Sequence, residues 1–392
     1  AYTQFRYASE HVTHGSAITA LEAVRTAVEA SAKVLPGPWG NYLAWIDNEL
    51  SRLWTMQGAA PGLGSALSCF DAKFNGTLFA LALAPELDVS EDVWSVVEAI
   101  FDGTRTAPAN APKITSMQRK RFNLLKQDAD RYDLMRLLAC FEITKEQAQD
   151  VISTADPAAV LANPYLIFEG SRLSSDPICL TTIDRCLFPA ADASATPALP
   201  RQPDIELDEP DHPLRLRAIV IEALEQAASQ GHTLLRADIL ATAVAELPLS
   251  QTVTVDAATL ELCEEEFAGE IDVCEYEDQP YAQLVRFAQA GNVIRAHIEA
   301  RLKQASANSV DWVQLVNSEF GAPASDDKDE KAAQEEKVAA LGILERSRIA
   351  ILTGAAGTGK TTLLKILIGQ PDVVGRDILL LAPTGKARVR LG

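Results

Sequence analysis

The chain is poor in cysteine, and its cysteines do not have metal-binding spacing. Six cysteines occur in 392 residues, at positions 69, 140, 179, 186, 263 and 274, and the five histidines are scattered. No Cys-x-x-Cys pair is present. This pattern argues against a zinc or disulfide framework and predicts buried, reduced thiols. Reduced thiols in turn predict a cytoplasmic location.

Long apolar runs are also missing. No run reaches the ~18 residues that a membrane-spanning helix needs, and no basic-then-apolar segment resembling a signal peptide opens the chain. We therefore expect no membrane partner. The chain is 47% hydrophobic and 23% charged, which is ordinary for a globular protein. Its length leaves room for roughly two to four domains.

Positive charge is scarce overall but locally concentrated. The net charge is −19 and the pI is about 4.7, which argues against nucleic-acid binding through the field of the whole protein. However, residues 113–136 hold seven basic and three acidic side chains. We interpret Arg119, Lys120 and Arg121 in this stretch as candidate DNA contacts, because a local basic channel can work within an acidic protein. An ordinary solvated face is the alternative.

The most specific pattern is a phosphate-binding loop. An apolar run at 349–352 is followed by G-x-x-x-x-G-K-[ST] and then by the apolar stretch 363–367, which predicts strand, loop and helix. Successive backbone N–H groups of such a loop, together with the helix N-terminus, bind phosphate oxygens. Lys360 is predicted to reach the β- and γ-phosphates of ATP and Thr361 to hold Mg²⁺. The candidate loop residues are Gly354, Ala355, Ala356, Gly357, Thr358, Gly359, Lys360, Thr361 and Thr362.

A second candidate site follows the next apolar segment, at 377–382. The turn Thr384-Gly385-Lys386 comes directly after it, with Arg388 and Arg390 behind. In a parallel α/β sheet the carboxyl ends of the strands share one edge, so this turn is predicted to lie beside the phosphate loop. An ordinary strand-to-helix loop with exposed basic residues is the alternative.

These two segments, LTGAAGTGKTTLLKIL and LLLAPTGKARVRL, resemble the first two motifs of RecD-like superfamily 1 DNA helicases. The resemblance implies an ATP-dependent helicase that uses ATP and Mg²⁺ and moves 5′ to 3′. It also implies that Thr384 and Lys386 grip the backbone of single-stranded DNA, or of DNA with a single-stranded end.

The same family carries a Glu-Gln pair upstream of the phosphate loop, whose Gln reads adenine. Glu336-Lys337 stands at the expected spacing, and Gln334 lies close to it but displaced. Gln334 is thus the candidate adenine contact, with a solvated helix residue as the alternative.

The predicted fold is a mainly α amino-terminal region followed by the start of an α/β, RecA-like P-loop domain. The expected parts are a helical domain (1–105), a helix-hairpin-helix-like region (117–188), a linker (189–213), a winged-helix-like module with a hairpin near 270–284 (214–320), an acidic flexible tether (321–336) and the beginning of the ATPase domain (337–392). Thr144 and Gln147 have capping-box spacing at the start of a helix.

Two features of the helical region have alternative interpretations. The glycine-containing turn 61–67 is either a hairpin whose N–H groups hold a DNA phosphate or a plain turn between helices. His232 is either a DNA or metal contact or, more in keeping with its position, a capping or core residue.

The sequence stops soon after the second motif. We therefore expect the acidic Mg²⁺ residue and the second RecA-like domain to be absent, and the 392-residue chain alone not to hydrolyse ATP. Two other functions stay open. One is a P-loop NTPase switch or nucleic-acid-defence protein without unwinding. The other is a helical platform (1–320) that recruits a protein partner such as a nuclease.

Overall fold

A computed structural model describes most of the chain. The described residues are 14–58, 60–87, 91–189, 207, 209–303, 310–324, 328–355, 357–370, 378–379 and 381. They divide into two compact units, Ala1–Arg286 and Phe287–Gly392. No described helix is both long enough and apolar enough to cross a membrane.

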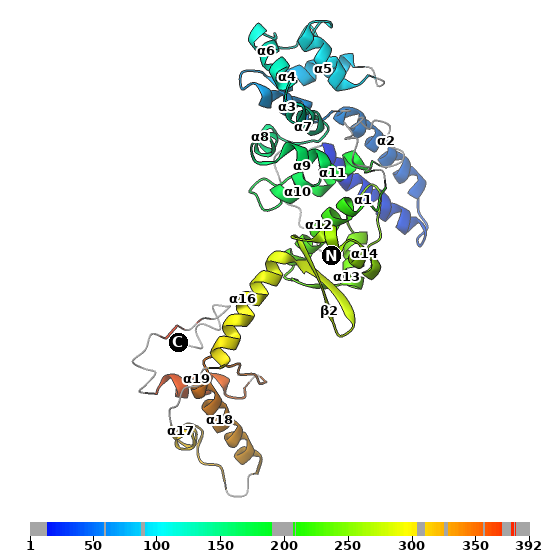
Figure 1. The fold of residues 1–392 in the computed structure, drawn as a ribbon. Coiled ribbons are helices and arrows are strands. Elements are labelled where there is room, and N and C mark those ends of the chain that lie inside the picture. The colour runs from blue at the N-terminus through cyan, green and yellow to red at the C-terminus, as the bar shows by residue number, and fades with distance from the viewer. Residues whose placement is uncertain are drawn as a thin grey trace. The chain divides into compact units, whose positions relative to one another are not determined.

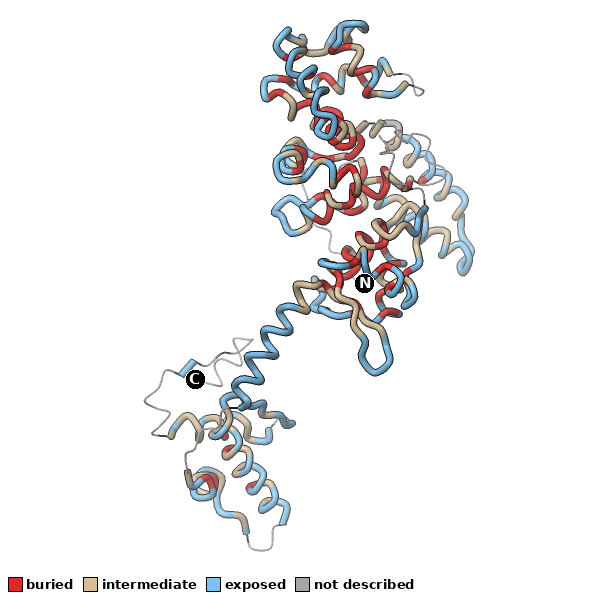
Figure 2. The backbone as a smooth tube through the Cα atoms, viewed as in Figure 1, coloured by how far each residue is buried: buried red, intermediate tan, exposed pale blue. Residues whose placement is uncertain are grey.

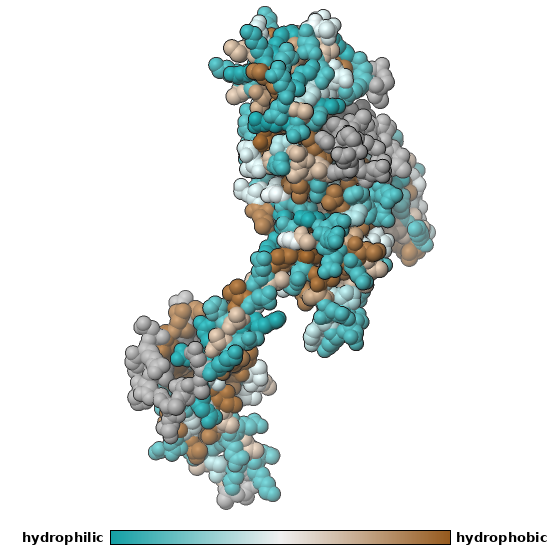
Figure 3. Space-filling model, in the orientation of Figure 1, coloured by the Kyte–Doolittle hydropathy of each residue, from teal (hydrophilic) through white to brown (hydrophobic). Residues whose placement is uncertain are grey.

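The first unit opens with a helical array. Its elements are α1 (His14–Ala32), α2 (Trp39–Gln57), α3 (Leu63–Phe70), α4 (Gly76–Leu83), the 3-10 turn η1 (Ala84–Glu86), α5 (Val93–Asp102), α6 (Ser116–Leu125), α7 (Ala129–Ala139), α8 (Lys145–Thr154), α9 (Pro157–Ala162), α10 (Leu166–Ser171) and α11 (Leu180–Leu187) (Figure 1). Burial is concentrated where these helices meet (Figure 2). The face of this array seen in Figure 3 is largely hydrophilic with scattered hydrophobic residues.

The predicted boundary between 1–105 and 117–188 does not separate two cores. Helix α3 packs on both α7 and α8. Phe101 of α5 stacks on Phe122 of α6 with ring centroids 4.3 Å apart, and both rings are buried. The Pro- and Thr-rich stretch between them therefore joins two helices of one core, because aromatic burial on both sides outweighs its loop-like composition.

Local sequence signals explain how several of these helices begin. Thr144 and Gln147 form the predicted capping box, in which each side chain bonds the other residue's backbone N–H. Thr115 and Gln118 do the same at α6. These bonds satisfy donors that would otherwise be left unpaired at the helix start.

The glycine turn at 61–67 serves close packing. The Gly62 N–H donates to the carbonyl of Ala139 at 3.0 Å. A Cβ at Gly62 would lie 2.2 Å from the carbonyl oxygen of Phe141, and one at Gly64 would lie 2.9 Å from the Cα of Thr77. The Gly62 N–H is already hydrogen-bonded, and other atoms fill the space around both glycines. The structure therefore supports the plain turn between helices.

The remainder of the first unit combines helices with a small sheet. Its elements are α12 (Pro213–Ser229), β1 (Leu235–Arg236), α13 (Ala237–Ala245), α14 (Ala257–Leu262), α15 (Glu264–Phe267), β2 (Ile271–Tyr276) and β3 (Gln279–Leu284). Helix α16 (Val285–Leu302) begins at the boundary, and all but its first two residues are assigned to the second unit. The strands are antiparallel in the order β1-β3-β2, with Leu235 opposite Ala282 and Ile271 opposite Leu284. This confirms the hairpin predicted near 270–284.

The second unit centres on α17 (Trp312–Phe320), α18 (Lys328–Arg346) and α19 (Lys360–Ile368). Trp312, Val316, Leu341 and Leu363 form its buried core. Two predictions are wrong here. Helix α17, assigned to the 214–320 module, packs with the phosphate-loop helix instead, because Trp312 and Val316 are buried against α18 and α19. The tether predicted at 321–336 is helical from Lys328 onwards.

The apolar segments predicted as strands of the second unit are not strands in the described residues. Residues 350–355 have no regular secondary structure, and Ile351 is 87% exposed. Leu379 and Leu381 are also exposed. A strand is defined by its pairing with a neighbour, and the described part of this unit offers these segments no partner. The described residues of this unit therefore do not show the predicted α/β sheet.

Candidate nucleotide site

The phosphate loop leads directly into a helix, as predicted. Gly357 and Gly359 adopt left-handed backbone conformations, with φ of 87° and 84°, which favour glycine because it lacks a Cβ. Gly359 is the N-cap of α19, and its carbonyl accepts a hydrogen bond from the Leu363 N–H at 2.9 Å. Lys360 is consequently the first residue of the helix, at the end where unpaired N–H groups favour an anion.

The Lys360 ammonium is hydrogen-bonded to backbone carbonyls of the loop itself. Its Nζ donates to the carbonyl of Gly354 at 2.7 Å and to that of Ala355 at 2.6 Å, and the lysine is half-buried. The Thr358 hydroxyl donates to the same Ala355 carbonyl at 3.0 Å. A phosphate oxygen carries more negative charge than a carbonyl, so it can take over the donors of Lys360 without a large rearrangement.

The remaining loop residues are placed in part. Thr361 is exposed at the start of α19, Thr362 is half-buried, and Leu363 anchors the helix in the core. Ala356 lies outside the described residues. The second candidate motif, with Thr384, Gly385, Lys386, Arg388 and Arg390, lies outside them too.

Gln334 is buried rather than solvated. It lies on α18 and is only 5% exposed. Its Nε2 donates to the carbonyl of Gly321 at 2.7 Å and to Oε1 of Glu330 at 3.2 Å. Its Oε1 has no hydrogen-bond partner. The alternative of a solvated helix residue is therefore wrong, and a buried acceptor without a donor is left in this unit.

Sequence reasoning missed an aromatic residue at the loop. Phe320 ends α17, and two atoms of its ring lie 3.3 Å from the position that a Cβ on Gly359 would occupy. The Lys337 ammonium lies 4.5 Å from the centroid of the same ring. No motif marks Phe320; only the close approach that Gly359 permits reveals it.

The basic cluster in the first unit is divided between structural and exposed side chains. Arg119 donates from Nη1 to the carbonyls of Ile100 and Phe101, at the C-terminus of α5. Arg121 pairs with Asp71, whose pKa is held below its usual range by the Lys73 N–H and this guanidinium. Lys120 is exposed. Lys120 is thus the member of the predicted trio with the greatest freedom to meet DNA.

Because Lys120 is exposed and Arg119 bonds to backbone carbonyls, replacing each of them should change a different property. Lys120→Ala should flatten the slope of log binding constant against log salt for single-stranded DNA by up to about 0.7, with no change in thermal stability. Arg119→Ala should instead lower the free energy of unfolding by about 1–3 kcal/mol, because the α5 carbonyls lose their donor. Salt-dependent DNA titrations and thermal melts of both variants measure this. An unchanged slope for Lys120→Ala would assign it to a solvated face.

Neither the histidines nor the cysteines form a metal site in the described part of the chain, where no cluster of three suitable side chains occurs. The His232 side chain is exposed, so a core role is wrong, and its backbone N–H closes the end of α12 by donating to Ala227.

All six cysteines are free, with Cys179 exposed against expectation. Burial raises the pKa of the Cys69 thiol to about 11, which keeps it protonated and unreactive at neutral pH.

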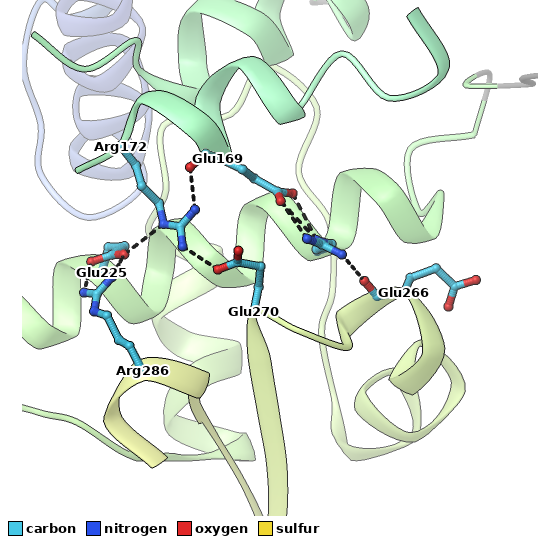
Figure 4. A network of polar contacts seen from close by, with 7 residues as sticks. Glu169, Arg172, Glu225, Glu266, Glu270 and Arg286 are labelled. Carbon is cyan, nitrogen blue, oxygen red and sulfur yellow. Dashed lines mark hydrogen bonds and ion pairs between the residues drawn. The ribbon is translucent and has the colours of Figure 1, made fainter. Parts of the chain in front are cut away.

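Other charged residues of the first unit pair with one another (Figure 4). Arg217 of α12 makes a bidentate contact with Glu169 of α10, with the closest N–O distance 2.8 Å. Arg172 contacts Glu225 at 3.2 Å and also reaches Glu270. Arg286 pairs with Glu225. These contacts tie α10, α12, β2 and α16 together, so we interpret them as structural rather than as a binding site.

Comparisons with known proteins point to the same unit and family. A family model described as an AAA domain matches residues 331–392. The chain is 30% identical over 188 residues to the ATP-dependent RecD2 DNA helicase of Deinococcus radiodurans, an alignment covering 46% of this chain and 25% of the relative. No solved structure matches the chain. The RecD-like helicase resemblance predicted from the two motifs is therefore confirmed over the parts that these matches cover. The chain spans about a quarter of its relative's length.

Proposed function

We propose that this chain supplies the nucleotide site and DNA-binding helical modules of an ATP-dependent DNA helicase of the RecD-like kind. The observation that carries the proposal is the loop itself. Two left-handed glycines deliver Lys360 to the first position of α19, where its ammonium is held by carbonyls that a phosphate can replace. The match to an AAA domain supports this assignment.

The loop has the donors that a triphosphate with Mg²⁺ requires. Lys360 would bind the β- and γ-phosphates, and the exposed hydroxyl of Thr361 would serve as a Mg²⁺ ligand. The N–H groups at the start of α19 would bind phosphate oxygens. Bound Mg²⁺ would neutralise charge on the phosphates during hydrolysis. The contribution of the chain is to hold the triphosphate in place and to compensate its charge.

Gln334 is the proposed adenine contact. Its buried Oε1 has no donor, and a buried acceptor without a partner costs roughly 1–3 kcal/mol. The exocyclic amine of adenine would supply the missing donor. The Nε2 bonds to Gly321 and Glu330 fix the side-chain amide in the orientation that leaves Oε1 without a donor.

The helical unit is proposed to contact DNA through two modules. One is a helix-hairpin-helix-like region within 117–188. The other is a winged-helix-like module, for which the order of one helix, β1, three further helices and a hairpin, with sheet order β1-β3-β2, is the supporting observation. Contacts of this kind read the DNA backbone rather than the bases.

The turn Thr384-Gly385-Lys386 is proposed to couple single-stranded DNA to ATP hydrolysis. In the intact protein, Thr384→Ala combined with Lys386→Ala should leave DNA-free ATP hydrolysis nearly unchanged but remove most of its stimulation by single-stranded DNA. The reason is that a hydroxyl, a backbone N–H and an ammonium recognise phosphate without contributing to nucleotide binding. The measurement is ATPase rate against oligonucleotide concentration.

Two outcomes would contradict the helicase assignment. A double variant stimulated like wild type, at the same half-saturating DNA concentration, would remove this turn from the mechanism. Failure of the intact protein to unwind a forked duplex while it hydrolyses ATP would favour a P-loop NTPase switch.

A further inference from the structure

The nucleotide site extends beyond the segment matched by the family model. That match begins at residue 331, whereas α17 ends at Phe320. Helix α17 nevertheless belongs to the core behind the phosphate loop, because Trp312 and Val316 are buried with Leu363 of α19. The Trp312 indole N–H also donates to Glu345 of α18 at 2.8 Å. The position of Phe320 is therefore fixed by packing.

The ring of Phe320 meets the loop at the residue before Lys360. Two of its atoms, Cε1 and Cζ, lie 3.3 Å from where a Cβ on Gly359 would stand. Any side chain larger than hydrogen at 359 would push against this ring. The absence of a side chain at Gly359 thus serves two purposes: it allows the left-handed turn and it admits the edge of an aromatic ring.

Two residues of α18 hold the end of α17 in place. The Lys337 ammonium lies over the Phe320 ring at 4.5 Å, a cation–π contact, and its side chain is only 17% exposed. Gln334 holds the next residue through the Gly321 carbonyl. The same glutamine carries the unpartnered Oε1. Phe320 thus contacts the phosphate loop, and the residue that follows it is bonded to the glutamine that carries the buried acceptor.

We infer that Phe320 is a nucleobase platform of the nucleotide site: its half-buried ring stacks on the base while the loop holds the phosphates. This inference rests on the proposed function, since it requires nucleotide to bind at the loop. The chemical reasoning is that an aromatic ring fixed next to a phosphate-binding glycine offers a flat apolar surface within reach of a bound nucleoside. Stacking is indifferent to base identity, so Phe320 contributes affinity, whereas Gln334 contributes adenine preference.

A base-free ligand separates this role from a purely structural one. Magnesium tripolyphosphate occupies the phosphate loop but has no base. In calorimetric titrations of the 392-residue chain, Phe320→Ala and Phe320→Leu should weaken Mg-ATP binding by about 10- to 100-fold and leave tripolyphosphate binding unchanged. Leu keeps apolar volume in the core, which separates loss of stacking from loss of packing. Phe320→Trp should restore ATP affinity.

Three other results would overturn the inference. Equal weakening of both ligands would show that Phe320 only braces the loop. Unchanged ATP affinity in both variants would show that the base does not meet the ring. If the wild-type chain binds neither ligand, both the proposed nucleotide site and the stacking role of Phe320 are wrong. Lys360→Ala, which should lose both ligands, is the control that separates failure of the loop from failure of the platform.

Discussion

Replacing Lys360 with Ala should abolish useful ATP binding by this chain. The ammonium makes two charge-assisted hydrogen bonds to the loop carbonyls, and we expect these donors to pass to the phosphates. Losing them should weaken Mg-ATP binding by at least about 100-fold, or about 2.8 kcal/mol. In the intact protein the same change should abolish ATP hydrolysis. Nucleotide titration by calorimetry measures the first effect and an ATPase assay the second.

The fold should survive this replacement, since Lys360 is only half-buried and its ammonium bonds to carbonyls of an exposed loop. Lys365→Ala is the control: Lys365 is an exposed lysine on α19 that lies more than one turn from the loop. It should bind ATP like wild type and have the same melting temperature. If Lys360→Ala binds ATP as tightly as Lys365→Ala, the phosphate-loop assignment is wrong.

The glycine turn that leads into α19 could be predicted because its chemistry is local. Left-handed turns favour glycine, and the helix start places Lys360 and Thr361 at fixed offsets, so a short pattern contains nearly all the necessary information. The capping box of Thr144 and Gln147 was predictable for the same reason. In both cases every important contact lies within a few residues along the chain.

The rest of the site could not be predicted, because it depends on contacts between distant segments. Phe320 lies 39 residues before Gly359 (359 − 320), and only tertiary packing brings the two together. The acidic composition of 321–336 suggested a tether, but this segment includes the first turns of α18, where Gln334 is buried. Composition gives only the average polarity of a segment, whereas the packing of an amphipathic helix depends on the residues along one of its faces.

The strands predicted for the second unit are not seen in its described residues. Apolar runs such as 349–352 favour a buried strand, but that outcome requires a neighbouring strand. Ile351 is exposed among the described residues. Pattern analysis therefore identified segments able to form a sheet without establishing that the sheet forms.

Arg215 and Arg217 of α12 show how basic side chains are paired within the first unit. Arg215 is fully buried, and Arg217 pairs with Glu169. Basic side chains can thus be neutralised by carboxylates of the same protein, and sequence alone does not show which ones are.

Asp184 is expected to be the most sensitive charged residue of the first unit. It is 1% exposed on α11 and receives the Arg215 guanidinium at 2.7 Å and 2.9 Å. The Tyr165 hydroxyl donates to the same carboxylate at 2.8 Å. Burial, together with this carboxylate, raises the pKa of Tyr165 well above its ordinary value, so the phenol stays protonated. Arg215 also donates to the backbone carbonyls of Pro210 and Gln251, which joins α12 to two loops.

Asp184→Asn should therefore lower the free energy of unfolding by about 3–5 kcal/mol, because it leaves the buried Arg215 charge without a counter-ion. Denaturation followed by circular dichroism measures the change. Asp238→Asn is the control: Asp238 pairs with Arg236 on the surface, where solvent screening makes such pairs weak, and it should melt like wild type. The double variant Asp184→Leu with Arg215→Met should be less destabilised than Asp184→Asn, since it leaves neither charge buried.

If Asp184→Asn melts like the surface control, the buried pair does not hold α11 to α12. If the double variant is the less stable of the two, the loss comes from packing rather than from an unpaired charge.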